Sequence, residues 1–278
     1  MNIASGLSDQ YEDAAGTRHT PLGVGGRARI VCLVPSITEL LFELDLGEQV
    51  VGRTHYCIHP ELELRGVPSL GGTKKINLSR LTEVAPTHVI VNVDENTKEM
   101  VDRIRPLVPH IIVTHPIDPK DNLHLYRLLG GIFGREPEAE DLCARFNAAY
   151  DAATADAQNW GAKRVLYLIW KDPWMTVSAD TYISRMLATV GWQTVAHDPE
   201  TRYPEIEMTD EFLAGVDLVL FSSEPFAFSE VHVDDFNAAH PGGPHALLVD
   251  GEMTSWYGSR AIEGLAYLAR LAGNSTPK

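Results

Sequence analysis

Three side chains of the kind that bind metal ions alternate in one short stretch of the chain. His55, Cys57 and His59 stand at every second position of segment 53–60, and Tyr56 lies between the first two. In an extended segment alternate side chains project to the same side, so these three could hold zinc or another borderline metal ion. No fourth ligand is evident in the sequence. The alternative is a loop in which Tyr56 lines a pocket and the histidines are surface or capping groups.

Aromatic side chains recur in the loops that follow the predicted strands. Ligands of open α/β sheets bind at the carboxyl ends of the strands, and a large, planar, partly apolar ligand packs well on aromatic faces. Taken singly, each ring is more often part of a core, but together they predict a ligand cleft. The aromatic residues expected to contact the ligand are Tyr56, Trp170, Trp174, Tyr203, Phe226, Trp256 and Tyr257.

Two polar residues complete the predicted ligand site. Ser36 directly follows a predicted strand and forms a capping box with Glu39, and this helix start could offer N–H groups to a polar ligand. Lys74 belongs to the loop 71–77, whose glycines and lysines could cradle an anionic group, although the spacing is not that of a P-loop. A purely capping Ser36 and a merely exposed Lys74 are the simpler interpretations.

Motifs of the common enzyme classes are absent from the sequence. There is no G-x-S-x-G, no Walker A, no H-E-x-x-H, and no G-x-G-x-x-G after a predicted strand. No set of residues forms a recognisable catalytic triad. We therefore expect a non-enzymatic binding protein with no catalytic residue and no required cofactor.

Apolar runs alternate with helical patterns on both sides of the chain's centre. Continuous apolar segments such as 29–34 and 164–169 are typical of strands buried on both faces of a parallel sheet. Between them, residues 119–160 read as two helices with a break at 134–137. The second helix, of about twenty residues at ~1.5 Å each, would be a rod of roughly 30 Å.

These patterns predict an α/β fold with two lobes of mostly parallel sheet flanked by helices, bridged by one long helix, with a ligand cleft between the lobes. The predicted parts are a flexible N-terminal segment (1–26), an N-terminal α/β lobe (27–118), a linking helical segment (119–160) and a C-terminal α/β lobe (161–278).

Local signals also predict where individual helices begin. Asn77 and Asp180 are expected to cap the helices that follow them, and Ser259 is expected to cap the last helix. Residues 250–258 are expected to form a loop after the last strand.

Composition excludes several classes of protein. The chain has 278 residues, a net charge of −15 and 44% hydrophobic residues. The negative charge argues against nucleic acid as a partner, and no apolar run approaches the ~20 residues of a membrane span, so no membrane insertion is expected. Residues 1–26 lack the features of a signal peptide. This favours the cytoplasm, or the periplasm if a leader was removed.

The order of several short motifs between residues 29 and 272 resembles that of a known family, the class III substrate-binding proteins of ABC importers (helical backbone metal receptor superfamily), and most closely its cobalamin-binding members. The segments that carry the resemblance are 34–39, 51–60, 77–81 with 86–91, 172–176, 202–204 and 255–256.

This resemblance implies a small-molecule ligand, namely cobalamin or a related corrinoid held between two lobes, and an ABC permease as partner if the protein is exported. Tyr56, Tyr203 and Trp256 match pocket aromatics of the family. Thr73 and Asn92 depart from it, because the cobalamin binders carry tryptophan at both positions. The alternatives are a receptor for a metal or a metal chelate such as a siderophore or haem, using His55, Cys57, His59 and Glu95, and a corrinoid-processing enzyme.

Overall fold

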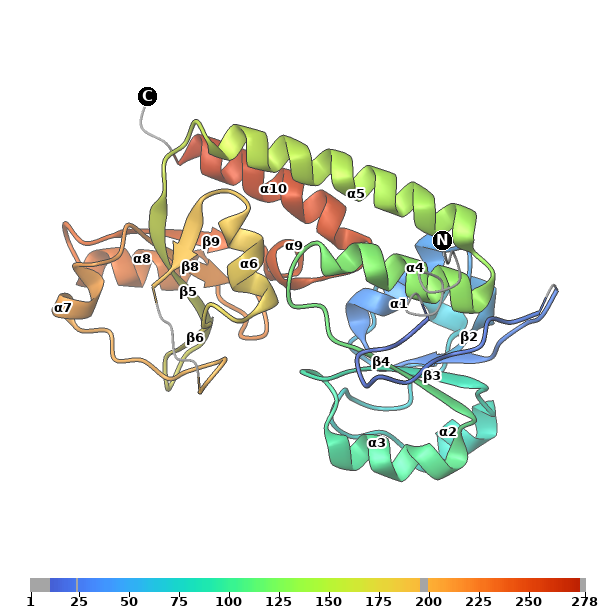
Figure 1. Cartoon of the computed structure of the whole chain (residues 1–278). Coiled ribbons are helices and arrows are strands. Elements are labelled where there is room, and N and C mark those ends of the chain that lie inside the picture. Colours follow the sequence, from blue (N-terminus) through green and yellow to red (C-terminus); the bar gives the residue numbers. More distant parts are fainter. Residues whose placement is uncertain (1–10, 24, 196–199, 276–278) are drawn as a thin grey trace. The chain divides into compact units, whose positions relative to one another are not determined.

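The structure is a computed structural model that describes residues 11–23, 25–195 and 200–275. The chain divides into two compact units (Figure 1). Unit 1 comprises Met1–Pro116, Lys120–Arg145 and Tyr257–Ser259, and unit 2 comprises Ile117–Pro119, Phe146–Trp256 and Arg260–Lys278. Each unit contains a largely parallel sheet flanked by helices, which confirms the predicted fold class.

Unit 1 is built on a four-stranded parallel sheet of order β2-β1-β3-β4. Its helices α2 and α3 lie on one face of the sheet, and α1 and α4 lie on the other (Figure 1). Every residue of β1 and β3 is buried, as continuous apolar runs predict for the central strands of a parallel sheet. The elements are β1 (Ile30–Cys32), α1 (Pro35–Glu43), β2 (Val50–Arg53), α2 (Leu78–Val84), β3 (His88–Asn92), α3 (Lys98–Ile104), β4 (His110–Thr114) and α4 (Asp121–Phe133).

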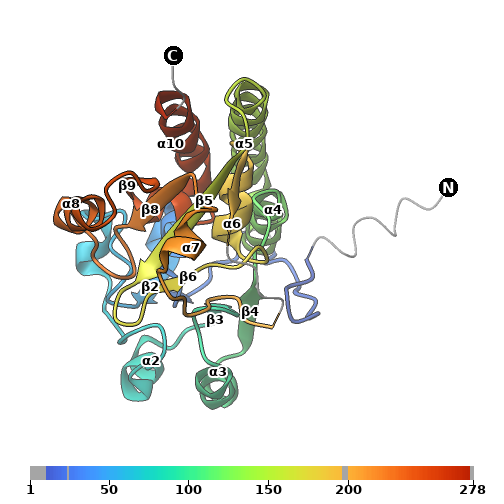
Figure 2. The same cartoon turned by 90° about the vertical axis from the view of Figure 1, so that its left-hand side faces the viewer.

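Unit 2 is built on a five-stranded sheet. Strands β7 and β8 pair with β5 in parallel, β9 pairs with β8 in parallel, and β6 pairs with β5 in antiparallel orientation. Helices α6 and α8 lie on opposite faces of this sheet (Figure 2). The elements are β5 (Lys163–Trp170), β6 (Met175–Thr176), α6 (Tyr182–Ala188), β7 (Trp192–Thr194), α7 (Asp210–Leu213), β8 (Leu218–Ser222), α8 (Glu230–Ala239), β9 (His245–Val249), α9 (Gly251–Ser255) and α10 (Arg260–Asn274).

The predicted pair of central helices is present as α4 and α5 (Glu136–Ala157). Gly134 ends α4 in the left-handed conformation, with φ of +68°, which glycine adopts without steric cost. The unit boundary falls inside α5, between Arg145 and Phe146, so this helix contributes residues to both units. None of the described helices is long and apolar enough to cross a membrane.

Helix starts show where local sequence signals succeed and fail. Asn77 caps α2 as predicted, since its side chain accepts a hydrogen bond from the N–H of Arg80. The prediction for Asp180 is wrong, because Thr181 is the N-cap of α6 and accepts from the N–H of Ser184. The capping box of Ser36 is also wrong, because α1 already begins at Pro35 and Ser36 lies inside its first turn.

Two predictions near the end of the chain are corrected as well. The expected loop 250–258 contains the short helix α9, whose N-cap is Asp250. The Ser259 hydroxyl is buried without a hydrogen-bond partner, so it does not cap α10.

Within the described part of segment 1–26, residues 11–19 pack against β4. The Asp13 carboxylate is buried and accepts hydrogen bonds from the N–H of Val113 at 2.9 Å and from His19 at 3.0 Å. A buried carboxylate with several donors holds the backbone around it in place. These hydrogen bonds therefore join residues 11–19 to β4.

His88 lies buried at the amino end of β3. Its ring stacks on His110 with 4.7 Å between centroids and meets Phe133 edge-on at 5.1 Å. Burial, with repulsion from His110 and His19, lowers the pKa of His88 from 6.5 to about 4. Folding therefore favours the neutral ring, and the resulting stability is complete above pH 6.5 and is lost as the pH falls towards 4.

We expect the free energy of unfolding to fall by about 1–2 kcal/mol between pH 7 and pH 5 through His88 alone. Urea denaturation of His88→Gln at both pH values should show most of this difference removed. His245→Gln, at an exposed position, is the matched control and should keep the wild-type pH dependence. An unchanged pH dependence in His88→Gln would contradict a neutral, buried His88.

Gly264 lies where α10 packs closely against α9 in unit 2. A Cβ at this position would lie 2.2 Å from the carbonyl oxygen of Met253. Gly264→Ala should therefore lower the free energy of unfolding by about 2–4 kcal/mol, as measured in urea. Gly273→Ala in the same helix is the control, because the nearest atom would be 3.6 Å away, an ordinary contact. It should be neutral or stabilise by up to about 1 kcal/mol, and equal losses in both variants would refute this packing.

Candidate functional site

In unit 1 the chain makes a turn directly after β2. The Arg53 guanidinium donates hydrogen bonds to the carbonyl oxygens of Thr54 and Cys57, both at 3.1 Å, and so closes the turn around its own side chain. Tyr56 projects outward and is 55% exposed, with its ring 4.1 Å from that of His55. The turn thus presents an open aromatic ring at the carboxyl end of β2, where ligands of such sheets bind.

The same turn removes the arrangement on which the predicted metal site depended. Segment 54–60 is not extended, so His55, Cys57 and His59 do not project to one side. The Cys57 thiol is buried and lies 3.1 Å from the Thr38 hydroxyl and 3.2 Å from that of Thr54.

Burial raises the pKa of Cys57, which disfavours the thiolate that binds metals. Among the described residues no group of three His, Cys, Asp or Glu side chains is placed to hold a metal ion. The structure therefore does not support a protein-built metal centre at His55, Cys57 and His59.

Lys74 lies on a tight hairpin turn between Gly71 and Ile76. The N–H of Gly72 donates to the carbonyl oxygen of Lys75 at 2.9 Å, and Gly71 and Ile76 form an antiparallel bridge. Gly71 has a φ of +129°, and a Cβ there would lie 2.6 Å from the Lys75 oxygen, so the turn requires glycine. Lys74 is exposed.

Tyr257 and Ser36 lie in the interior of unit 1. The Tyr257 hydroxyl donates to Glu95 at 2.5 Å, and burial together with the charge of Glu95 raises the pKa of this phenol well above 10. The next residue, Gly258, is held by Asn122 at 2.6 Å and by Tyr126 at 2.9 Å. These bonds fix segment 257–259 in unit 1.

In unit 2 the end of β5 presents Trp170. This ring is 42% exposed and meets Phe226 edge-on at 5.5 Å between centroids. The N–H of Phe226 donates to the carbonyl oxygen of Ile169, which places Phe226 against the end of β5. An exposed indole supported from behind by a half-buried ring is a suitable surface for a flat ligand.

Trp174 directly precedes β6, and Tyr203 belongs to the segment that pairs with this strand. Trp174 is half-buried and stacks on Phe228 at 6.1 Å, so one face of its ring belongs to the core of unit 2. Tyr203 is 37% exposed, and its segment is tied to β6 by the hydrogen bond from the Thr176 N–H to the Pro204 oxygen at 3.0 Å. Tyr203 therefore presents more open ring surface than Trp174.

Trp256 is only 8% exposed and is held by two residues that the sequence analysis did not single out. Its indole N–H donates to Glu224 at 2.7 Å, and the Arg260 guanidinium lies 5.0 Å from the ring centroid. Burial raises the pKa of Glu224, while the hydrogen bond from Trp256 acts in the opposite direction. The position of Glu224 directly after β8 was the available signal, but its partner could not be read from the sequence.

The nine residues predicted to bind the ligand thus fall into three groups by exposure. Those with open surface are Tyr56, Lys74, Trp170 and Tyr203; those half-buried are Trp174 and Phe226; those buried are Ser36, Trp256 and Tyr257.

Comparison with known proteins identifies the family. A family model described as "Periplasmic binding protein" matches residues 30–224. The uncharacterized ABC transporter substrate-binding lipoprotein YvrC of Bacillus subtilis (strain 168) is 25% identical over 252 residues, which are 87% of this chain and 78% of the relative.

Two solved structures share the fold. The periplasmic vitamin B12 binding protein BtuF of Vibrio cholerae has a TM-score of 0.74 at 15% identity, over 89% of this chain and 99% of that one. The periplasmic heme-binding protein RhuT from Roseiflexus sp. RS-1, in apo form, has a TM-score of 0.75 at 23% identity, over 90% and 99%. These findings confirm the resemblance that the motifs predicted. Since the family model covers more than half of the sequence, the chain belongs to the periplasmic binding protein family.

Proposed function

We propose that this protein is the substrate-binding component of an ABC importer and binds a metal-bearing tetrapyrrole, namely cobalamin or a related corrinoid. Membership of the periplasmic binding protein family supports a binding role without catalysis. The observation that carries the ligand class is the exposed indole of Trp170, supported by Phe226 at the carboxyl end of β5. Flat macrocycles bury a large apolar face, and an aromatic ring offers a matching surface.

Haem is the second candidate, and two residues favour it over cobalamin. Thr73 and Asn92 replace the tryptophans that the resemblance leads one to expect in a cobalamin binder. Asn92 is buried, and its side-chain oxygen accepts from the N–H of Asp94 at 2.8 Å, so it contributes to the loop rather than to a ligand wall. The relative RhuT is named as a heme-binding protein.

We further propose that the protein works outside the cytoplasm with a membrane permease. The relative YvrC is named as an ABC transporter lipoprotein, and BtuF and RhuT are named as periplasmic. The expectation of a cytoplasmic protein receives no support from these relatives.

Titration of the purified chain with hydroxocobalamin and with haemin, followed by absorbance and tryptophan fluorescence, tests the proposed ligand class. Saturable binding of either compound is the expected result. Trp170→Ala and Tyr203→Ala should each weaken that binding about tenfold, because each removes a ring from the contact surface.

Trp160→Ala is the matched control, since Trp160 precedes β5 at the opposite end of the strand from Trp170. It should bind as tightly as the wild type. The proposal fails if neither compound binds to a folded chain, and the assignment of Trp170 fails if all three variants bind equally.

A further inference from the structure

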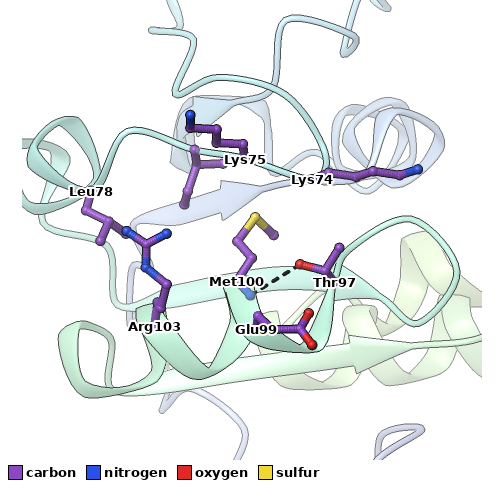
Figure 3. A pocket seen from close by; sticks show the side chains of 8 residues that line it. Lys74, Lys75, Leu78, Thr97, Glu99, Met100 and Arg103 are labelled. Carbon is purple, nitrogen blue, oxygen red and sulfur yellow. Dashed lines mark hydrogen bonds between the residues drawn. The ribbon is translucent and has the colours of Figure 1, made fainter.

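A basic pocket lies in unit 1 between the hairpin turn 71–76 and helix α3 (Figure 3). Its volume is about 210 Å³. In Figure 3 the side chains of Lys74 and Lys75 come from the turn, and those of Met100 and Arg103 come from the helix across from it. The remaining lining residues are Ile76, Leu78, Thr97 and Glu99. The pocket therefore combines an apolar floor with a cationic rim, on which the amino groups of Lys74 and Lys75 point away from α3 (Figure 3).

The cations of this rim lack ion-pair partners. In the part of the chain that the structure describes, Lys74, Lys75 and Arg103 form no salt bridge, although the chain carries a net charge of −15. Lys98, on the same helix, pairs with Asp102 at 3.0 Å. Glu99 is the one acidic residue that lines the pocket, and it leaves an excess of positive charge there.

The turn that carries the two lysines is fixed to the carboxyl edge of the sheet. The buried Asn96 side chain donates to the carbonyl oxygen of Thr73 at 2.8 Å and accepts from the N–H of Asn92, the last residue of β3, at 2.8 Å. Asn96 thus joins the tip of the turn to the end of β3. The pocket lies at the edge where ligands of parallel sheets bind.

The basic surface continues beyond the pocket towards the exposed aromatic ring. A second, more open hollow shares Lys75 and Ile76 with it and is also lined by His55 and Arg80. The His55 and Tyr56 rings lie against the turn, since a Cβ on Gly72 would be 3.2 Å and 3.6 Å from them. An aromatic face and a cluster of cations therefore stand side by side in unit 1.

We propose that the basic pocket binds carboxylate groups of the ligand, so that this protein selects a tetrapyrrole with free carboxylate side chains over one whose side chains are all amides. This inference rests on the proposed function and, within it, favours haem or a corrinoid with free carboxylates over cobalamin, whose corrin side chains are amides. Lysine and arginine bind carboxylates through charge-assisted hydrogen bonds, whereas a neutral amide forms weaker ones. The apolar floor suits the short alkyl stems on which such carboxylates are carried.

A local cationic pocket is also what a polyanionic ligand requires on this protein. The overall negative charge repels anions at long range. A cluster of cations without internal partners offsets that repulsion where the ligand docks, and its effect should weaken with added salt.

The test compares ligands with free carboxylates and counterparts in which the carboxylates are masked. Affinities are measured for haemin against haemin dimethyl ester and for cobyrinic acid against its amidated counterpart cobinamide, at low and high salt. The chains are the wild type, the double variant Lys74→Gln/Lys75→Gln, the single variant Arg103→Gln and the control Lys98→Gln. Lys98 is an exposed cation on the same helix that does not line the pocket, so its variant removes one charge without changing the site. Circular dichroism confirms that each chain is folded.

We expect the wild type to bind at least one acid about tenfold more tightly than its neutral counterpart. The double variant and Arg103→Gln should lose most of that preference and its salt dependence, and Lys98→Gln should keep both. Equal binding of acid and neutral forms, or an unchanged preference in the pocket variants, would overturn the inference while leaving the proposed function standing. Absence of binding of all four compounds and of hydroxocobalamin would overturn both.

Discussion

The parallel pairing of strands is the constraint on which the rest of the structure depends. A parallel sheet must be buried on both faces, which requires helices between successive strands and leaves only its edges for function. In unit 1 the pairing of β3 with β1 and β4 brings the turn after β2, the Asn96 loop and segment 257–259 to one edge of the sheet. In unit 2 the pairing of β5 with β8 does the same for Trp170, Phe226 and Glu224.

The polar residues at these edges mostly serve to hold the loops in place. Glu224 and Arg260 keep the Trp256 ring against unit 2, and Glu95 holds the Tyr257 hydroxyl inside unit 1. A buried carboxylate is costly unless it is hydrogen-bonded, so each of these pairs constrains the loop that carries it. Rings that stay exposed beside such fixed loops are therefore presented in a defined position, which lowers the ordering cost of binding a ligand.

Much of the fold could be predicted from the sequence because its signals are local. Buried strands appear as continuous apolar runs, the break between α4 and α5 is marked by Gly134, and Asn77 caps α2. The failures depend on contacts between residues far from one another or on competition between neighbours. Thr181 displaces Asp180 as a cap one residue away, and segment 54–57 turns inward because the Arg53 side chain binds two of its carbonyl oxygens.

The loops that carry the candidate residues could be predicted from the sequence, but the exposure of those residues could not. That post-strand loops would carry the candidate residues follows from topology, and Tyr56, Trp170 and Tyr203 do present open rings. Whether a given ring faces solvent or core depends on partners such as Phe228 behind Trp174, and nothing in the local sequence reveals these. The basic pocket is of the same kind, because Arg103 and Lys74 line one pocket only through the packing of α3 against the turn.

Hydrogen–deuterium exchange of the full chain, with and without saturating haemin or hydroxocobalamin, tests the central claim most directly. The account predicts slower exchange in peptides that contain residues 54–57, 71–76, 169–175 and 202–206, and little change in α8 or in the amino ends of the strands. Protection confined to other segments, or no protection by either compound, would contradict a binding surface at the carboxyl edges of the two sheets.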